Sequence, residues 1–139
     1  MTRSRTDTSV ETATSGLRAQ AGRMRVISEN IANADSTASS PGGEPYRRKV
    51  PTFSSELDRT LDAKVVTLGK VRPDASAFRV KHEPGNPAAD AAGNVKYPNV
   101  NPLVEMTDMR EAQRSYEANL NIISATRRMI QRTLDILKA

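Results

Sequence analysis

Apolar residues recur every three to four positions along the last third of the chain, from Asn101 to Ala139. A stripe sustained over more than four heptads predicts a long helix of the coiled-coil type over residues 102–138, roughly 55 Å long at about 1.5 Å per residue. Asn101 is its predicted N-cap and Pro102 its first helical residue. The heptad a positions are Met106, Gln113, Leu120, Arg127 and Leu134, and the d positions are Met109, Tyr116, Ile123, Ile130 and Leu137.

A second heptad series runs near the N-terminus and predicts another long helix, which ends near residues 33–36, where turn-forming residues accumulate. Thr8 and Glu11 fit a capping box at its start. We expect the two helices to form an antiparallel pair, in which Leu17, Met24 and Ile31 face Leu120, Ile123, Ile130 and Leu134. The series consists of Val10, Ala13, Leu17, Gln20, Met24, Ile27, Ile31 and Ala34.

The opposite face of the C-terminal helix carries a second apolar stripe, formed by Ala118, Ile122, Ala125, Met129 and Ile136. A second stripe implies a second packing partner, and in so short a chain we expect that partner to be another molecule. Scattered surface apolar residues are the alternative interpretation. Arg127 occupies an a position, where it either fixes a specific interface or lays its stem along the seam with its charge in water.

The middle of the chain predicts short strands. A Ser-, Gly- and Pro-rich loop covers residues 36–45, and residues 46–53 fit an extended edge strand that contains a proline. The spacing of Phe53, Leu57 and Leu61 favours a short helix over residues 54–62. Residues 64–68, 78–82 and 95–97 fit strands, and the alternation of apolar and basic residues makes 78–82 a half-buried one.

These patterns predict a mainly α protein with a small β-rich module. The N- and C-terminal long helices form an antiparallel coiled-coil pair, with extended loops and a β-hairpin segment between them. The predicted division is residues 1–35 for the N-terminal helix of a helical rod domain, 36–101 for the loop and β-rich module, and 102–139 for the C-terminal helix.

The composition narrows the choice of function. The net charge is +5, divided as +1, +3 and +1 over residues 1–40, 41–101 and 102–139, so no segment is a basic block. Binders of nucleic acid or anionic membranes normally concentrate such charge on one surface. No apolar run reaches the ~18 residues of a membrane span, and the first residues lack the apolar region of a secretory signal.

The sequence contains no recognisable catalytic or metal-binding motif. The chain has no cysteine and one histidine, His82, which fits the end of a strand better than a metal site. No phosphate-binding loop or nucleophile elbow occurs. The Arg47-Arg48-Lys49 cluster fits the protection of an edge strand better than a phosphate contact. We therefore expect no enzyme activity, no cofactor and no metal.

Six segments of the chain carry a resemblance to a known family: residues 15–20 and 30–37, Pro45 to Lys49, Glu83 to Asp90, Tyr97 to Asn101, and Glu105 to Leu120. Together they resemble the bacterial flagellar rod and hook axial protein family. The N-terminal part of the resemblance is common to that whole family, whereas the Tyr-Pro-Asn-Val segment and the short length are similar to its proximal rod members. The resemblance covers nearly the whole chain and is least clear over residues 54–81.

This resemblance implies a structural subunit of the flagellar basal-body rod. Such a subunit is exported without a cleaved signal peptide through the flagellar type III apparatus, assembles in the periplasm, and transmits torque from motor to hook. Its partners are other copies of itself and neighbouring rod proteins. The assembly interface predicted on this basis comprises Leu17, Met24, Ile27, Asn30, Ile31, Asn33, Tyr116, Leu120, Ile122, Ile123, Arg127, Met129, Ile130, Leu134 and Leu137.

A different class of function stays open at this point, namely a basic helical protein that binds nucleic acid or serves as an adaptor. The spread of charge, the doubly apolar helices and the five aromatic residues favour the assembly subunit.

Overall fold

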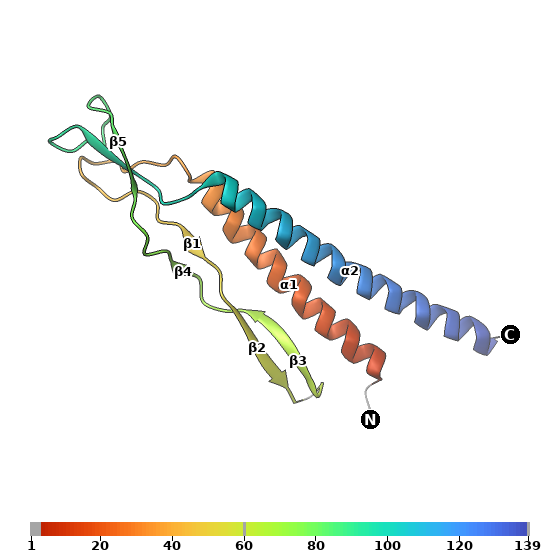
Figure 1. The fold of residues 1–139 in the computed structure, drawn as a ribbon. Coiled ribbons are helices and arrows are strands. Elements are labelled where there is room, and N and C mark those ends of the chain that lie inside the picture. The colour runs from red at the N-terminus through yellow and green to blue at the C-terminus, as the bar shows by residue number, and fades with distance from the viewer. Residues whose placement is uncertain (1–3, 60, 139) are drawn as a thin grey trace. The chain divides into compact units, whose positions relative to one another are not determined.

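A computed structural model describes residues 4–59 and 61–138. The described chain contains two long helices with short antiparallel strand pairs between them, which confirms the predicted fold class in this coarse form (Figure 1). Strand β1 pairs with β4, β2 with β3 and β5 with β6. The elements in order are α1 (Arg5–Ala32), β1 (Lys49–Val50), β2 (Phe53–Asp58), β3 (Ala63–Leu68), β4 (Arg72–Pro73), β5 (Arg79–His82), β6 (Asn94–Tyr97) and α2 (Pro102–Lys138).

The start of α2 is the one predicted from sequence, whereas α1 starts earlier than predicted. Asn101 Oδ1 accepts a hydrogen bond from the Leu103 N–H at 3.1 Å, and Pro102 is the first helical residue. Helix α1 begins at Arg5 with Ser4 as its cap, whose Oγ accepts from the Thr6 N–H at 3.3 Å. The predicted cap at Thr8 is wrong because Ser4, an equally good capping residue, lies one turn earlier.

The chain divides into two compact units, which we describe separately. Unit 1 comprises Met1–Met24, Thr52–Lys70 and Arg110–Ala139, and therefore holds the first part of α1, the β2–β3 hairpin and most of α2. Unit 2 comprises Arg25–Pro51 and Val71–Met109, and holds the end of α1, the remaining strands and the first turns of α2.

In unit 1 the β2–β3 hairpin packs on α1. The Val66 N–H donates to Ser15 Oγ at 3.2 Å. A Cβ on Gly22 would lie 2.6 Å from Leu68 Cδ2, so the absence of a side chain at Gly22 allows this close approach.

The predicted short helix over residues 54–62 is wrong, because most of that segment is strand β2. Its four-residue spacing of apolar positions fits a strand equally well, since residues two and four apart lie on the same face. The segment is a strand because it pairs with β3, which is rich in β-branched residues: Phe53 pairs with Leu68 and Asp58 with Ala63.

Unit 1 also places α2 antiparallel to the first part of α1. Asn119 lies against Gly16, where a Cβ would be 3.0 Å from the amide, and Arg23 forms a 3.3 Å ion pair with Glu111. The covered side of α2 in this unit is formed by small, polar and a few larger residues at spacings of three and four: Ala112, Ser115, Tyr116, Asn119, Ile123 and Thr126.

One row of the predicted seam is therefore displaced by one position. Ile123 and Tyr116 lie on the covered side, as predicted, but Leu120 and Leu134 are each 45% exposed. Ile130 is 38% exposed as well, so the predicted burial of Leu120, Ile130 and Leu134 against α1 is wrong. Arg127 is also exposed, and its role at a specific interface stays a prediction. The covered row is Ala112, Asn119 and Thr126, whose small or polar side chains did not register as a hydrophobic stripe.

In unit 2 the β5–β6 hairpin has a small core of its own, formed by Ala88, Val95 and Tyr97. Gly93, in the connecting loop, has a φ of 82°, which glycine adopts without strain. The strand predicted over 78–82 is present as β5, with His82 at its end, but all four of its residues are exposed. Its predicted half-burial is wrong because the core lies under β6.

The predicted edge strand over residues 46–53 is shorter in the structure. Within residues 46–52, only Lys49 and Val50 pair, with Pro73 and Arg72 of β4. Strand β2 then begins at Phe53, beyond Pro51. In the described part of the chain, neither helix combines the length and apolar character needed to cross a membrane.

Candidate functional site

A buried polar network occupies unit 2, and Asn30 in the last turns of α1 is its centre. Asn30 is 1% exposed, and all the hydrogen-bonding capacity of its amide is used. Its Nδ2 donates to the Lys49 carbonyl at 2.8 Å and to Glu105 Oε2 at 3.3 Å. Its Oδ1 accepts from the Tyr46 hydroxyl at 2.7 Å and from the Lys49 N–H at 2.9 Å. One side chain thus joins α1, β1 and α2.

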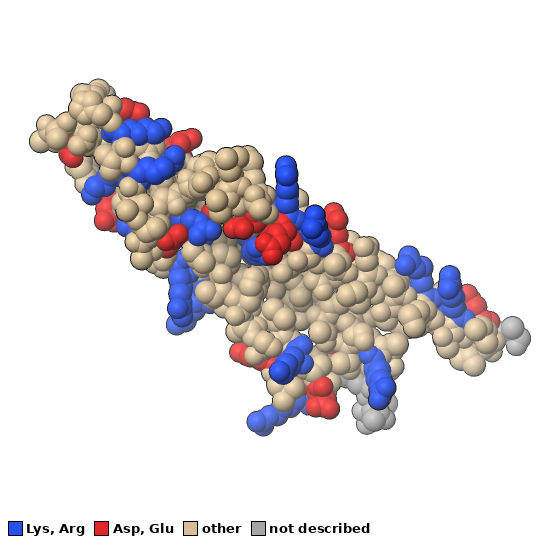
Figure 2. Space-filling view, in the orientation of Figure 1, with Lys and Arg blue, Asp and Glu red and all other residues tan. Residues whose placement is uncertain are grey.

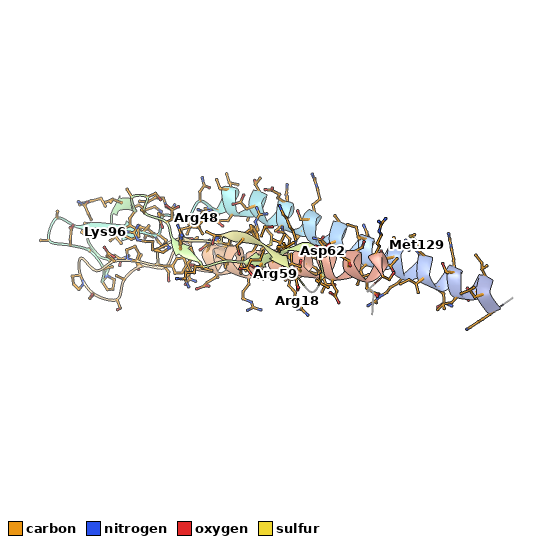
Figure 3. All side chains as sticks on the ribbon, turned by 90° about the horizontal axis from the view of Figure 1, so that it is seen from below. Arg18, Arg48, Arg59, Asp62, Lys96 and Met129 are labelled. Atoms are coloured by element: carbon orange, nitrogen blue, oxygen red, sulfur yellow. The ribbon has the colours of Figure 1, made fainter. Side chains whose placement is uncertain are left out.

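Glu105, in the first turn of α2, is the acidic member of this network and is fully buried. Its second carboxylate oxygen accepts from Nε of Arg48. Arg48 also lies 3.2 Å from Asp74 and 3.7 Å from Asp108. Figure 3 labels Arg48 among the side chains. Burial lowers the pKa of Arg48, but the hydrogen bonds and charges of Glu105 and Asp74 outweigh it and raise that pKa above its ordinary value.

The loop after β4 closes the network on its other side. The Arg48 N–H donates to Asn99 Oδ1 at 2.7 Å, and Asn99 Nδ2 donates to the carbonyls of Asp74 and Ser76 at 3.1 Å. Ser76 in turn donates its N–H to Asp74 Oδ1 at 2.8 Å. The hydrogen bonds from Ser76, followed by that from Arg48, lower the pKa of Asp74. The charges of this site therefore compensate one another within one chain.

Tyr46 and Lys49 form the outer edge of the network. Burial, followed by the charges of Glu29 and Glu105, raises the pKa of Tyr46 to about 12. Lys49 Nζ pairs with Glu29 Oε1 at 2.5 Å. Arg47 stacks on Phe78, with its guanidinium carbon 4.1 Å from the ring centroid.

The Arg47-Arg48-Lys49 cluster is held by contacts within unit 2, and the protection of an edge strand favoured from sequence stays a prediction. Its cations lie in ion pairs or against a ring within unit 2. No local sequence signal could have revealed these contacts, because the Asn, Arg and Glu side chains that meet here belong to separate motifs. Only the rule that buried polar groups have partners connects them once the fold is known.

The turn between β5 and β6 is a second polar cluster in unit 2. Glu83 Oε2 accepts from the Tyr97 hydroxyl at 2.8 Å and from Asn86 Nδ2 at 3.2 Å. These hydrogen bonds, that of Tyr97 first, lower the pKa of Glu83. Asp90 Oδ1 accepts from the N–H groups of Ala92 and Asn94, both at 2.9 Å. The segment from Glu83 to Asp90 is thus a self-contained turn.

Acid is expected to weaken this turn. Because the folded state favours the ionised form of Glu83, its contribution to stability is present above the pKa of the unfolded carboxyl, roughly 4.3, and is lost as the pH falls through the lower folded pKa. Glu83→Gln should therefore show a smaller loss of melting temperature than the wild type between about pH 7 and pH 3. Tyr97→Phe, which removes the donor, should also reduce the acid sensitivity. Unchanged pH profiles in both variants would contradict this assignment.

The structure separates the predicted assembly residues into two groups. The first group is buried or half-buried: Leu17, Met24, Ile27, Asn30, Ile31, Asn33, Tyr116 and Ile123. The second group is exposed: Leu120, Ile122, Arg127, Met129, Ile130, Leu134 and Leu137. Their role in assembly stays a prediction. In the described residues, no group of three or more His, Cys, Asp or Glu side chains could hold a metal ion.

Two parts of the chain match models of known families. Residues 11–38 match the family described as flagella basal body rod protein. Residues 91–136 match the C-terminal family described for the flagellar basal body rod protein FlgEFG. The matched regions contain most of α1 and of α2, and both define a rod protein of the flagellar basal body.

Individual relatives are similar over nearly the whole chain. The flagellar basal-body rod protein FlgC of Agrobacterium fabrum is 54% identical over 127 residues, which are 91% of each chain. FlgC of Bacillus subtilis is 39% identical over 94% of this chain and 97% of its own. FlgC of Salmonella typhimurium is 38% identical over 89% of this chain and 92% of its own. The chain belongs to the FlgC family of flagellar basal-body rod proteins.

Membership of this family confirms the resemblance seen in the sequence, and with it the function as a structural subunit of the basal-body rod. The alternative, a basic helical protein that binds nucleic acid or serves as an adaptor, is not supported.

Proposed function

We propose that this rod subunit polymerises through the exposed faces of its terminal helices, together with other copies of itself and neighbouring rod proteins. In this proposal it lies in the proximal, periplasmic part of the rod and transmits torque from motor to hook. It reaches that place uncleaved through the flagellar type III export apparatus.

The observation that carries the proposal is the number of large apolar side chains that α2 exposes. Ile122 and Met129 are seven residues apart and therefore share one face of the helix, and they are 48% and 62% exposed. Leu120, on another face, is 45% exposed. Exposed apolar side chains that gather on a surface mark an interaction site. In the folded chain the covered side of the helix is supplied by small and polar residues, so the large apolar ones remain available to neighbours.

We also propose that α1 and α2 pair as an antiparallel coiled coil. Within unit 1 the support is that Asn119 approaches Gly16 and that Glu111 pairs with Arg23. These two contacts lie seven residues apart on α1 and eight residues apart on α2. The support within unit 2 is the hydrogen bond of Asn30 to Glu105. Such a pair can transmit torsion because it fixes two helices along their length.

A double substitution, Leu120→Ser with Ile122→Ser, tests the assembly surface in a strain that lacks the native chain. The purified variant should keep its helicity, because both side chains are exposed, yet swimming should fall to the level of the deletion strain and isolated basal bodies should lack the rod. Asn121→Ser, at the exposed position between them, is the matched control and should swim normally. Normal motility of the double variant would disprove the proposed surface.

A further inference from the structure

The net positive charge of the chain comes from one of the two units. Unit 1 has thirteen basic and eight acidic residues, which give the whole net charge of +5, whereas unit 2 has eight of each. The even spread seen along the sequence is therefore misleading, because each unit combines segments that are far apart in the chain. Concentrated charge is the property expected of a protein that binds an anionic surface.

Within unit 1 the excess is greatest at the end of α2. We define the α2 tip as residues 127–138. It holds four basic residues and one acidic residue, a net charge of +3, and each of its residues is exposed. Counting back from the contact of Gly16 with Asn119, the first residue of α1 lies opposite about residue 130 of α2, so most of the tip extends past α1.

The α2 tip is amphipathic. At roughly 100° per residue, six positions fall in an arc of about 160° and the other six in the remainder. The apolar arc comprises Met129, Ile130, Thr133, Leu134, Ile136 and Leu137. The polar arc comprises Arg127, Arg128, Gln131, Arg132, Asp135 and Lys138. Figure 2 shows Lys and Arg side chains standing along one edge of this end of α2, and Figure 3 places Met129 at its start.

We propose that the α2 tip binds the surface of a bilayer that contains anionic phospholipids. The helix would lie in the interface, with its apolar arc at the boundary of the acyl chains and its Arg and Lys side chains among the phosphates. The apolar arc and the positive charge of the tip favour this partner over two others. A polyanion such as DNA would neutralise the basic side chains but leave the apolar arc in water, and two copies of the tip would repel each other through their charges of +3.

This inference does not rest on rod assembly. Lipid binding needs only the free chain, before neighbouring subunits cover the apolar arc. A subunit held at the membrane surface would be concentrated where it is delivered, and packing against rod neighbours would then replace the lipid contact.

Flotation with lipid vesicles tests the proposal on the full chain. The protein should float with vesicles of phosphatidylglycerol and phosphatidylcholine in equal amounts, much less with phosphatidylcholine alone, and less again in high salt. Arg128→Glu with Arg132→Glu should weaken binding by at least about 25-fold, since each basic residue near an anionic surface contributes roughly a fivefold factor.

A matched control separates the tip from net charge. Lys64→Glu with Lys70→Glu makes the same change of charge in the same unit, at two exposed positions, and should change binding less than fivefold. Ile136→Ser with Leu137→Ser, at side chains that are 74% and 76% exposed, should lose the binding that persists in high salt. The total helicity measured by circular dichroism should be close to that of the wild type in all variants.

Several results would overturn the proposal. These are no flotation of the wild type, equal flotation with neutral vesicles, or an equal loss of binding in the lysine control. Tip-dependent self-association in sedimentation without lipid binding would assign the tip to a second copy of the chain. Tip-dependent DNA binding without lipid binding would assign it to a polyanion. The motility of the variant with Leu120→Ser and Ile122→Ser does not affect the flotation result. The proposal of lipid binding and the proposal of rod assembly can therefore be disproved separately.

Discussion

Replacement of Glu105 by alanine is expected to lower the free energy of unfolding by about 3 kcal/mol. Glu105 is fully buried, and its loss leaves Arg48 Nε and one of the two N–H donors of Asn30 Nδ2 without an acceptor. Removing one partner of a buried ion pair costs more than the pair contributes, because the remaining charge stays desolvated. Arg48 retains Asp74 and Asp108, which keeps the effect at the lower end of the usual range. Denaturant unfolding followed by circular dichroism measures it.

Glu111→Ala is the matched control on the same helix. Glu111 also pairs with an arginine, Arg23, but its side chain is 68% exposed. Such pairs contribute about 0–1 kcal/mol, so this variant should remain close to the wild type. Equal effects of the two alanine variants would mean that the burial of Glu105 has no energetic consequence, and the network would then lose its assigned role.

The second large effect is expected for Asn30→Leu, which should cost about 3 kcal/mol or more. Leucine has a similar volume but leaves the Tyr46 hydroxyl, the Lys49 backbone and one oxygen of Glu105 without partners. Each buried polar group left unsatisfied costs about 1–3 kcal/mol. Urea unfolding of the purified chain gives the value.

Asn33→Leu provides the comparison, one turn along the same segment. Among the described residues, the Asn33 side chain donates to the Glu29 carbonyl within its own helical turn, at 2.8 Å, and its loss should cost less than about 1 kcal/mol. An Asn30→Leu chain that is as stable as the wild type but defective in rod formation would instead place Asn30 at an interface with a neighbour.

The helices could be predicted from sequence because their apolar spacing is long and uninterrupted. The face by which α2 packs on α1 in unit 1 could not be predicted, because it contains the small or polar residues Ala112, Asn119 and Thr126. A hydrophobic stripe identifies where large side chains recur, and here those side chains lie on the outward face. The same cause explains why the covered row of α2 lies one position away from the predicted one and why Arg127 is exposed.

The network in unit 2 was hidden for a different reason. Asn30, Arg48, Asn99 and Glu105 each look like an ordinary surface residue in its local segment. Their common environment depends on bringing positions up to 75 residues apart together, which no local pattern reports. All four residues lie in segments that resemble the family, but the resemblance alone does not reveal that their side chains contact one another.

The hydrogen bonds of Asn30 also fix the order in which unit 2 can form. A chain that emerges from a ribosome or a narrow conduit with its N-terminus first presents Asn30 early, while Glu105 follows 75 residues later. Until then the amide has only the partners contributed by Tyr46 and Lys49, and closing so long a loop costs conformational entropy that no local contact offsets. Unit 2 therefore completes its folding only after the start of α2 has emerged.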